Sequence, residues 1–598
     1  MHTQSSKTIT RRSFLATASA ATAVAATHRL QATEAPREVL REFPYSAVTL
    51  SGGPFKAHYD RIHAHYLALS NDRLLKVYRQ RAGLPAPGAD MGGWYDLDGF
   101  VPGHSLGQYI SGLARIGAST GDAKCHEKVQ ELVTGFAATL GPDNRTILRP
   151  QTNLWTCYTL DKHFAGLIDA VTLSKVGDAR NLLNRVLAGA MPLLPAAGHD
   201  RIGKKDPPYD ETFVMPENLF TAGELTGNAA FTELARRYLL DRELFDPLAS
   251  GKDPFPGQHA YSHAIALSSG AKAYLTLGDA SYKQALQNAS TLLTTTQQFA
   301  SGGWGPNETF ITPGRGELHA ALSSTVDHFE TPCGAYAATK LARYLLRFTA
   351  DPRYGDNLER VLYNTILAAK TPDSDGDYPY YSTYSPDATK VFYQKKWPCC
   401  SGTLVQTVAD YVLNIYLQAS DGLFVNLYTP SSVKWDHHGV SVAVSQVTQF
   451  PADDRVTLRV DPASALDFAL TLRIPAWATQ PTISINGKPQ AMAPKAGTTA
   501  ALRRHWKAGD TVELTLPQTF RVEAIDAQHP NTVAPMRGPV EYVALNRSGA
   551  ATNKTNQVRP SLKQDFKPVG AQAYASGPST FIPLYSIQDE TYDTYFEI

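Results

Sequence analysis

Six short turn signals recur along the first two thirds of the chain, each between two stretches with helical spacing of apolar residues. They are Asn71-Asp72, Gly121-Asp122, Gly177-Asp178, Gly227-Asn228, Gly278-Asp279 and Ala350-Asp351. Their second residues are separated by 50, 56, 50, 51 and 72 residues. A near-constant repeat of helix pairs is typical of a helical array, and six pairs can close on themselves as a ring. The pattern predicts an (α/α)6 barrel domain over residues 56–418.

The last interval is longer than the others, and the excess contains residues 304–330. A loop inserted into a regular repeat is more often functional than structural. In Ser301-Gly302-Gly303-Trp304, the glycines would let the backbone approach a ligand and Trp304 could stack on a sugar. Glu308 follows in aromatic surroundings, where burial would raise its pKa toward that of a general acid. A solvated surface loop is the plain alternative, and Glu317 is a rival for the acid role.

The character of the sequence changes after Asp421. Short alternating segments with turn residues such as Asn486-Gly487 between them are typical of antiparallel β-sandwiches. We therefore expect a mainly α then β chain, with one or two sandwiches over residues 419–598. Residues 33–55 are expected to be an extended segment with a short strand at most. The expected strands are 423–428, 439–444, 456–460, 468–473 and 511–516.

The first 32 residues are typical of a twin-arginine export signal. Arg11-Arg12 precedes Phe14-Leu15 and a weakly apolar Ala/Thr run, and Ala32 suits cleavage. Removing this segment takes away four basic residues and no acidic ones, so the net charge falls from +1 to −3. We expect a periplasmic or secreted protein with no membrane span, because no later apolar run reaches about 18 residues. The charge indicates no nucleic-acid partner, and the oligomeric state stays open.

Three of the five cysteines fall in two stretches that are each expected to open a helix. Cys333 follows Pro332, which suits the first turn of a helix, and Cys399-Cys400 precedes an apolar helical face. Glu330 lies just upstream of Cys333. Thiolates and carboxylates are zinc ligands, so Glu330, Cys333, Cys399 and Cys400 would complete a tetrahedral S₃O shell around Zn²⁺. A cysteine at a helix N-terminus is also favoured as the thiolate, the form that attacks electrophiles.

Other interpretations of these cysteines stay open. Cys399 and Cys400 could form a vicinal disulfide, although adjacent residues close a strained and readily reduced ring. The cysteines could be inert core residues, which is usual for free cysteine, or they could build a closed structural zinc site. Cys125 and Cys157 stand apart and are expected to pack in the core. An odd number of cysteines argues against a full disulfide framework.

Aromatic and histidine clusters fall on the loops between the predicted helices. Trp94, His104, His259 and Tyr381 belong to such clusters. A single histidine on a helix is usually structural, but several on recurring loops of one barrel, together with Trp and Tyr, indicate a pocket for a polyhydroxylated ligand. With Trp304, these residues are the predicted substrate contacts. The expected partner is an oligosaccharide or polysaccharide.

Several motifs resemble those of glycoside hydrolase families 127 and 146, the β-L-arabinofuranosidases. The resemblance spans about residues 45–545, and its specific part is Cys399-Cys400 with the upstream Glu330 and Cys333. The supporting motifs are Gly92-Gly93-Trp94, Gly103-His104-Ser105-Leu106-Gly107, Glu308-Thr309-Phe310, Tyr354-Gly355-Asp356, Leu472-Arg473-Ile474-Pro475-Ala476-Trp477 and Ile485-Asn486-Gly487.

The resemblance implies a retaining hydrolase with a zinc-bound cysteine as nucleophile. By position, Cys399 is that nucleophile, and Glu330, Cys333 and Cys400 complete the zinc shell. Glu308 would protonate the leaving oxygen and later activate water. The chain departs from the family at two places. The family commonly has Glu-x-Cys, whereas two residues separate Glu330 from Cys333, and a His-Lys pair common in relatives is Asp161-Lys162 here, which bears on the sugar recognised.

The leading hypothesis is an exported zinc-thiolate glycoside hydrolase that removes terminal β-L-arabinofuranose or a similar sugar from plant-derived glycans. One alternative is a hydrolase or lyase on the same barrel that uses carboxylate or histidine chemistry, with structural cysteines. Another is a carbohydrate-binding protein without catalysis. Metal content separates the first hypothesis from the others, and turnover of an aryl furanoside separates an enzyme from a binder.

Overall fold

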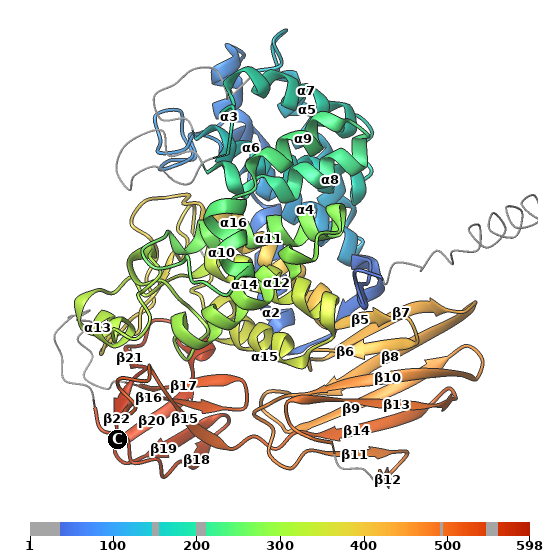
Figure 1. The fold of residues 1–598 in the computed structure, drawn as a ribbon, viewed down its shortest axis with the longest axis vertical. Helices are drawn as coiled ribbons and strands as arrows, with labels where there is room; N and C mark the ends of the chain where they lie inside the picture. Colours follow the sequence, from blue (N-terminus) through green and yellow to red (C-terminus); the bar gives the residue numbers. More distant parts are fainter. Residues whose placement is uncertain (1–35, 146–154, 199–210, 373, 491–493, 546–559) are drawn as a thin grey trace, which may run out of the picture. The chain divides into compact units, whose positions relative to one another are not determined.

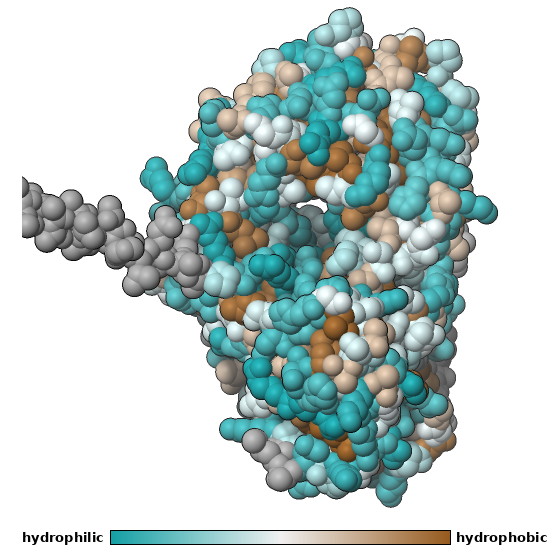
Figure 2. Space-filling view, turned by 90° about the vertical axis from the view of Figure 1, so that its right-hand side faces the viewer, coloured by the Kyte–Doolittle hydropathy of each residue, from teal (hydrophilic) through white to brown (hydrophobic). Residues whose placement is uncertain are grey.

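The structure is a computed structural model that describes residues 36–145, 155–198, 211–372, 374–490, 494–545 and 560–598. Residues 38–598 make one unit, in which a helical domain precedes three large β-sheets along the described chain (Figure 1). The predicted signal segment, residues 1–32, lies outside the described residues. Figure 2 shows one largely hydrophilic face, hollowed at the level of the helical domain. No helix in the described ranges has both the length and the hydrophobicity needed to cross a membrane.

Six helices form a closed ring, because each contacts the next and the sixth contacts the first. They are α4 (Leu106–Thr120), α6 (Thr156–Thr172), α8 (Pro216–Thr226), α11 (Ala260–Leu277), α14 (Thr331–Thr349) and α16 (Cys400–Ala409). Glycine allows the closest approach in this ring: a Cβ on Gly107 of α4 would lie 1.8 Å from the Lys162 carbonyl oxygen of α6. The closed order confirms the predicted (α/α)6 barrel.

Five of the six inner helices are followed by an outer helix across one of the predicted turns. The outer helices are α5 (Ala123–Ala138), α7 (Ala179–Ala190), α9 (Ala229–Tyr238), α12 (Ala280–Leu292) and α15 (Pro352–Val361). Asp122, Asn228, Asp279 and Asp351 cap four of them, each accepting a hydrogen bond from the backbone two residues on. The predicted repeat is thus built on caps that are local in sequence. Two shorter helices are α10 (Asp246–Ala249) and α13 (Glu317–Ser324).

The sixth pair differs from the prediction of six consecutive hairpins. The first turn signal joins α2 (Gly53–Leu67) to α3 (Asn71–Ala82), and neither helix belongs to the inner ring. Instead α2 packs against α16, so the two ends of the domain complete the barrel together. A ring closed in this way brings the last inner helix beside the first, which no local pattern encodes.

Two sheets make up the first part of the β region. One has the order β1-β5-β6-β10-β13 and the other β12-β11-β14-β9-β8-β7-β2. Their strands are β1 (Leu40–Glu42), β2 (Val48–Leu50), β5 (Tyr416–Ala419), β6 (Gly422–Val425), β7 (Ser431–His437), β8 (Val440–Thr448), β9 (Arg455–Pro462), β10 (Leu466–Ile474), β11 (Thr482–Ile485), β12 (Lys488–Pro489), β13 (Thr498–Trp506) and β14 (Asp510–Thr515). Pairing is antiparallel except between β6 and β10, which run parallel. The extended N-terminal segment supplies β1 and β2, one edge strand for each sheet.

The C-terminal part forms, in its described residues, one eight-stranded sheet rather than a second pair of sheets. Its strands are β15 (Phe520–Ala524), β16 (Thr532–Arg537), β17 (Val540–Leu545), β18 (Lys567–Gly570), β19 (Ala573–Ser576), β20 (Ser579–Pro583), β21 (Tyr592–Asp593) and β22 (Phe596–Glu597). The described residues after the first two sheets therefore form a single sheet, which differs from the paired sheets before it.

A buried arginine joins the barrel to the first sheets. Arg473 of β10 is fully buried and its guanidinium pairs with Asp356 and, at 2.9 Å, with Glu359 on α15. Trp477 donates its indole N–H to the other Glu359 oxygen at 3.0 Å. At Gly355 a Cβ would lie 2.5 Å from Arg473 Cδ, so only glycine leaves room for this side chain. The two motifs around Gly355 and Arg473 therefore meet at one interface.

Candidate active site

The two cysteine stretches lie at the N-termini of neighbouring inner helices, α14 and α16. Cys333 lies in the first turn of α14, while Cys399 is the cap and Cys400 the first residue of α16. Both stretches open a helix as predicted, and Glu330 is the N-cap residue of α14. Glu330 also ends the short strand β3 (Phe329–Glu330), which pairs with β4 (Tyr381–Ser382). The carboxylate thus comes from a strand and the thiols from helix starts.

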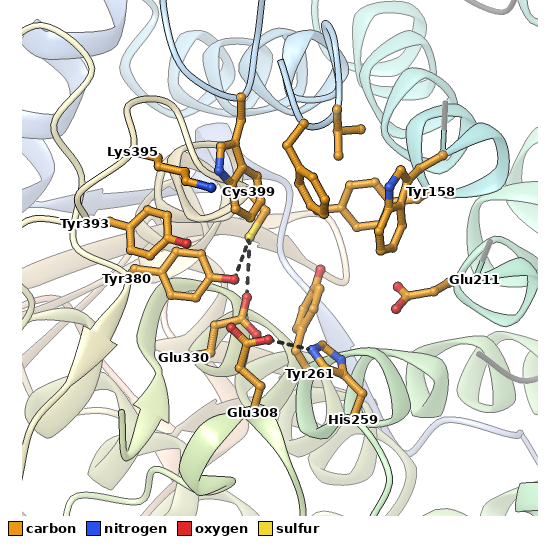
Figure 3. A pocket seen from close by; sticks show the side chains of 14 residues that line it. Tyr158, Glu211, His259, Tyr261, Glu308, Glu330, Tyr380, Tyr393, Lys395 and Cys399 are labelled. Carbon is orange, nitrogen blue, oxygen red and sulfur yellow. Dashed lines mark hydrogen bonds and ion pairs between the residues drawn. The ribbon is translucent and has the colours of Figure 1, made fainter. Parts of the chain in front are cut away.

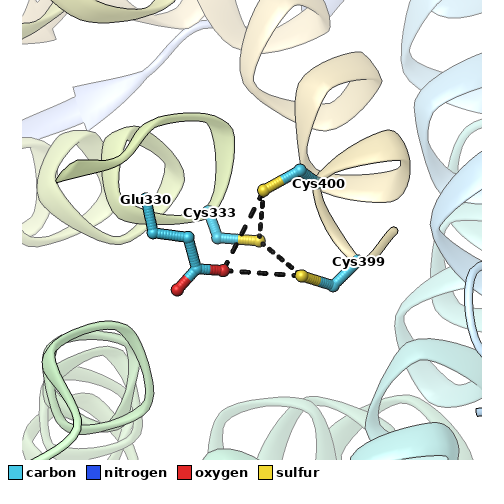
Figure 4. Close-up of side chains that lie close together, drawn as sticks. All are labelled: Glu330, Cys333, Cys399 and Cys400. Atoms are coloured by element: carbon cyan, nitrogen blue, oxygen red, sulfur yellow. Dashed lines mark hydrogen bonds between the residues drawn. The ribbon is translucent and has the colours of Figure 1, made fainter. Parts of the chain in front are cut away.

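The four predicted ligands form a buried cluster (Figure 4). Cys333 Sγ lies 3.6 Å from Cys399 Sγ and 3.5 Å from Cys400 Sγ. Glu330 Oε1 lies 3.4 Å from Cys399 Sγ and 3.9 Å from Cys400 Sγ. Ligands at about 2.3 Å (sulfur) and about 2.0 Å (oxygen) around a tetrahedral zinc would stand roughly 3.5–3.8 Å apart. The cluster therefore has the donor set and spacing of such a shell.

The extra residue between Glu330 and Cys333 is absorbed at the helix start. Glu330 has non-helical backbone angles (φ −71°, ψ 87°), and α14 begins at the next residue with Pro332 in its first turn. The change from strand to helix turns both side chains toward the same point. The unusual spacing is therefore compatible with ligation by Glu330.

Burial and mutual interaction shift the pKa of every member of this cluster. Burial, and then the nearby Cys399 charge, raise the pKa of Glu330 well above its usual value. Burial, together with the neighbouring thiols, also raises the pKa of Cys333 and that of Cys400. Burial also opposes ionisation of Cys399, but hydrogen bonds from the adjacent thiols hold its pKa well below the usual range. The second Glu330 oxygen, Oε2, is buried without a hydrogen-bond partner.

A pocket of about 280 Å³ opens beside the cluster (Figure 3). Its lining residues lie at the N-terminal ends of inner helices or in the loops before them. They are Trp94, Phe100, Val101, Trp155, Tyr158, Glu211, His259, Tyr261, Glu308, Glu330, Tyr380, Tyr393, Lys395 and Cys399. Among the lining residues of the described chain, Cys399 is the one thiol. Cys399 therefore faces the pocket, whereas Cys333 and Cys400 lie behind it.

Glu308 reaches the pocket from a strained turn. Glu308 and the preceding Asn307 both have positive φ, at 58° and 52°, which costs free energy in a non-glycine residue. Its Oε1 accepts from Tyr381 Oη at 2.5 Å, and its Oε2 lies 3.2 Å from His259 Nε2. A strained backbone that is held by two side-chain contacts at a pocket is typical of a functional residue.

The prediction that burial would raise the pKa of Glu308 is wrong. Burial does act in that direction, but the hydrogen bonds and charge of His259, with those of Tyr381 and Tyr380, lower the pKa to about 2. The rival, Glu317, does not line the pocket. Its Oε2 accepts from the backbone N–H of Thr312 at 2.9 Å, which holds its own loop at the start of α13.

The predicted sugar contacts fall into three groups. Trp94 and His259 line the pocket. Tyr381 is not a lining residue, but it donates a hydrogen bond to Glu308, which is one. His104 lies beneath the wall, fully buried, with its ring 6.2 Å from that of Trp94; burial lowers its pKa to about 4. Trp304 differs from the prediction, because it is 2 % exposed and packs against Phe329 in the core.

The glycines of two motifs serve loop packing rather than ligand approach. A Cβ on Gly93 would lie 2.1 Å from the Lys396 carbonyl oxygen, and Trp94 N–H donates to that oxygen at 3.0 Å. A Cβ on Gly303 would lie 2.7 Å from the Phe329 ring. The first contact fixes the chain just before Cys399, where Trp397 has a φ of 54° ahead of Pro398.

Sequence reasoning did not single out Glu211, Phe100, Tyr393 or Lys395 as pocket residues. Glu211 is buried in the wall and lies five residues before α8, and Tyr393 and Lys395 precede α16. The signal that could have found them is positional. All residues of the pocket wall lie at the start of an inner helix or in the loop before it. Polar residues at those positions are therefore candidate pocket residues, as the aromatic clusters are.

The sequence matches family models over most of its length. Residues 47–412 match the beta-L-arabinofuranosidase GH127 catalytic domain, and residues 422–518 match the GH127 middle domain. Among curated proteins, none matches the chain significantly.

Solved structures share the fold. A GH127 beta-L-arabinofuranosidase from Geobacillus stearothermophilus T6, Ara127N-Se, superposes with a TM-score of 0.72 at 21% identity, covering 92% of this chain and 99% of that one. The GH127 beta-arabinofuranosidase BT3674 gives 0.71 at 17% identity, covering 94% and 98%. At these low identities, the structural likeness shows the fold, and the match to the catalytic-domain model shows the family. The chain belongs to the GH127 β-L-arabinofuranosidase family and is a glycoside hydrolase.

Proposed function

We propose that this chain is a retaining hydrolase that removes terminal β-L-arabinofuranose, or a closely similar sugar, from plant-derived glycans with Cys399 as nucleophile. One observation carries the proposal: a thiol of the Glu330 cluster and the carboxylate of Glu308 line the same small pocket. A nucleophile and a proton-transferring group on one pocket are what a two-step displacement at an anomeric carbon needs.

The donor set of the cluster favours zinc. Glu330, Cys333, Cys399 and Cys400 would hold it, since three thiols and a carboxylate with near-tetrahedral spacing suit this borderline-soft ion. Bound zinc would keep the thiols ionised at neutral pH. A bound cation would favour the ionised forms of Glu330, Cys333 and Cys400, whose pKa values burial raises, and it would give the buried Glu330 carboxylate a partner.

In the first step, Cys399 Sγ attacks the anomeric carbon while the bond from that carbon to the leaving oxygen breaks and Glu308 gives that oxygen a proton. In the second, Glu308 takes a proton from water, the water oxygen bonds to the anomeric carbon, and the carbon–sulfur bond breaks. Two inversions give net retention. Glu308 begins as an acceptor, so a proton must reach it before the first step, and His259 is the neighbour placed to hold one.

The size and lining of the pocket favour a single terminal sugar. A volume of about 280 Å³ lies at the small end of ligand pockets, which run from roughly 300 Å³ upward. Tyr380, Tyr261 and Tyr158 combine aromatic faces with hydroxyl groups, which suits a polyhydroxylated ring. Removal of one unit from a chain end follows from a pocket that admits only one.

Export in the folded state is part of the same proposal. The twin-arginine pattern at Arg11-Arg12 supports it, and a metal-thiolate centre is best assembled in a reducing compartment. Fusion of residues 1–32 to a reporter should send it to the periplasm, and Arg11→Lys together with Arg12→Lys should block that export.

The deciding experiment is a panel of aryl glycosides assayed with the wild type and with Cys399→Ala. Hydrolysis of the β-L-arabinofuranoside by the wild type alone is expected. Turnover that survives in Cys399→Ala would support the hydrolase or lyase with structural cysteines. Binding of the sugars without any turnover would support the non-catalytic protein.

A further inference from the structure

A second group of metal-ligating side chains lies at the opposite end of the barrel wall. His63 Nε2 is 3.1 Å from Asp122 Oδ2 and 3.3 Å from Cys125 Sγ, and the three ligand atoms all lie within 4.8 Å of one another. The group sits at the turn after α4, whereas the active site lies before α4. Fifteen residues of helix, about 22 Å, separate those ends.

Contacts within this group run through a single nitrogen. The same nitrogen, His63 Nε2, faces both the carboxylate and the thiol. If Nε2 carries a proton, it can serve the Asp122 oxygen, but then it cannot accept from the Cys125 thiol. If Nε2 is unprotonated, it can accept a hydrogen bond from the thiol, but it then has no proton to donate to the carboxylate oxygen 3.1 Å away. A cation placed among the three atoms would satisfy the nitrogen, the oxygen and the sulfur together.

The helical repeat provides an internal comparison. Asn228, Asp279 and Asp351 cap their helices as Asp122 does, through the backbone N–H two residues on. The residue three places after each of those caps is aromatic, namely Phe231, Tyr282 and Tyr354. Only after Asp122 is it a cysteine, and only there, within the described residues, does a histidine from α2 join the cap carboxylate.

We propose that His63, Asp122 and Cys125 form a second zinc site, which ties α2 to the turn between α4 and α5. Nitrogen, oxygen and sulfur donors at about 2.0–2.3 Å from a tetrahedral zinc stand roughly 3.3–3.6 Å apart. The two contacts of His63 would need to open by about 0.2 Å, and the Asp122 oxygen and the Cys125 sulfur, which lie within 4.8 Å of each other, would need to draw together to that spacing. Cys125 is buried, while His63 and Asp122 are 18 % and 28 % exposed, so water can complete the shell. The site would stabilise the helix that completes the ring with α16.

Metal analysis of the purified full-length chain tests this site separately from the proposed function. The wild type should hold about two zinc equivalents after dialysis, and Cys125→Ser and Cys333→Ser should each hold about one. Cys157→Ser, which changes a buried cysteine outside both groups, should keep both equivalents. One equivalent in the wild type that Cys125→Ser leaves in place would overturn the second site. Loss of zinc in Cys333→Ser alone would do so as well.

A milder pair of variants keeps the test valid if Cys125→Ser fails to fold. Asparagine caps a helix as well as aspartate, so Asp122→Asn keeps the cap but removes the anionic ligand. We expect it to weaken the second site at least about tenfold in a chelator competition, and to abolish the rise in Tm that zinc gives at this site. Asp279→Asn, the same change in a turn without His and Cys, is the control. Equal zinc binding by these two variants would contradict the proposal.

Discussion

Two buried groups of charged side chains in this molecule differ in how their charges are balanced. Where the barrel meets the first sheets, Arg473 supplies a cation between the carboxylates of Asp356 and Glu359. At the pocket, Glu330 and three thiols lie together, and within the described chain no Lys or Arg pairs with them. The first group is complete within the chain. The second could hold a metal cation, which would balance its charge.

This difference separates a structural from a chemical use of buried charge. In the Arg473 group the guanidinium and the Glu359 carboxylate are fully buried, and Asp356 at its edge is 20 % exposed. The thiol cluster contributes Glu330 and one thiol, Cys399, to a pocket wall. A cluster that lacks its own counter-charge and borders a cavity can hold a metal and present a ligand atom to a substrate. The predictions below test that contrast.

The largest effect is expected at Cys399, the pocket-lining thiol of the incomplete cluster. Cys399→Ala should lower kcat/KM for an aryl β-L-arabinofuranoside by at least about 10⁴-fold, because the covalent step loses its nucleophile. Steady-state kinetics measure this directly. Cys157→Ser is the matched control and should leave the rate near that of the wild type, since Cys157 is a buried core residue outside the cluster. Comparable losses in both variants would point to a general effect on folding.

The next largest effect is expected at Glu308, whose carboxylate lies near that of Glu330 but does not belong to the thiol cluster. Glu308→Gln should cost roughly 10²–10⁴-fold on substrates with poor leaving groups and much less on activated aryl glycosides, because these need little protonation. Zinc content should not change. If Glu317→Gln shows this leaving-group dependence instead, the acid/base assignment is wrong.

Removing the cation of the complete group should cost stability rather than chemistry. Arg473→Ala would leave two carboxylates facing each other in a buried site, which is expected to lower the free energy of unfolding by about 3–5 kcal/mol. Denaturant unfolding measures the loss, and zinc content of the folded fraction should stay at the wild-type level. Arg459→Ala, which breaks the exposed pair with Asp461, should change stability little. Similar losses in the two variants would remove the distinction between the groups.

The smallest effect is expected from neutralising the carboxylate of the incomplete cluster. Glu330→Gln keeps an oxygen that can still coordinate, so zinc affinity should fall by about 10–100-fold. Cys333→Ser should reduce affinity further, because a hydroxyl replaces a thiolate. Competition with a chromogenic chelator ranks the two. The opposite order would mean that Glu330, and not the thiols, dominates metal binding.

The features that the sequence predicted are those set by neighbours along the chain. The Asp and Asn caps recur because each bonds to a backbone N–H two residues away, which gives the turns a visible period. The helix starts at Cys333 and Cys400 follow from Pro332 and from apolar spacing. Strands such as β9 and β14 were visible in their alternation.

The features that it did not predict depend on partners far away in the chain. The ring closes through the contact of α16 with α4, and α2 packs on α16 although the two helices lie some 340 residues apart. Glu308 has a lowered pKa because His259 arrives from another inner helix. Trp304 enters the core because Phe329 fills the space left by Gly303 beside it. The edge strand β13 runs Thr-Thr-Ala-Ala-Leu-Arg-Arg-His-Trp, without regular alternation of apolar and polar residues, and every second residue is exposed, so its hydrophobic signal is weak.

Covalent trapping tests the central claim most directly. The wild type would be treated with an electrophilic L-arabinofuranose analogue, such as a cyclophellitol-type or haloacetamide sugar, and the labelled peptide mapped by mass spectrometry. Of the three thiols in the cluster only Cys399 lines the pocket, so the label is expected on Cys399, with loss of activity in proportion to labelling. A label on Cys400 or Glu308, or inactivation with no modified cysteine, would contradict a thiolate nucleophile at Cys399.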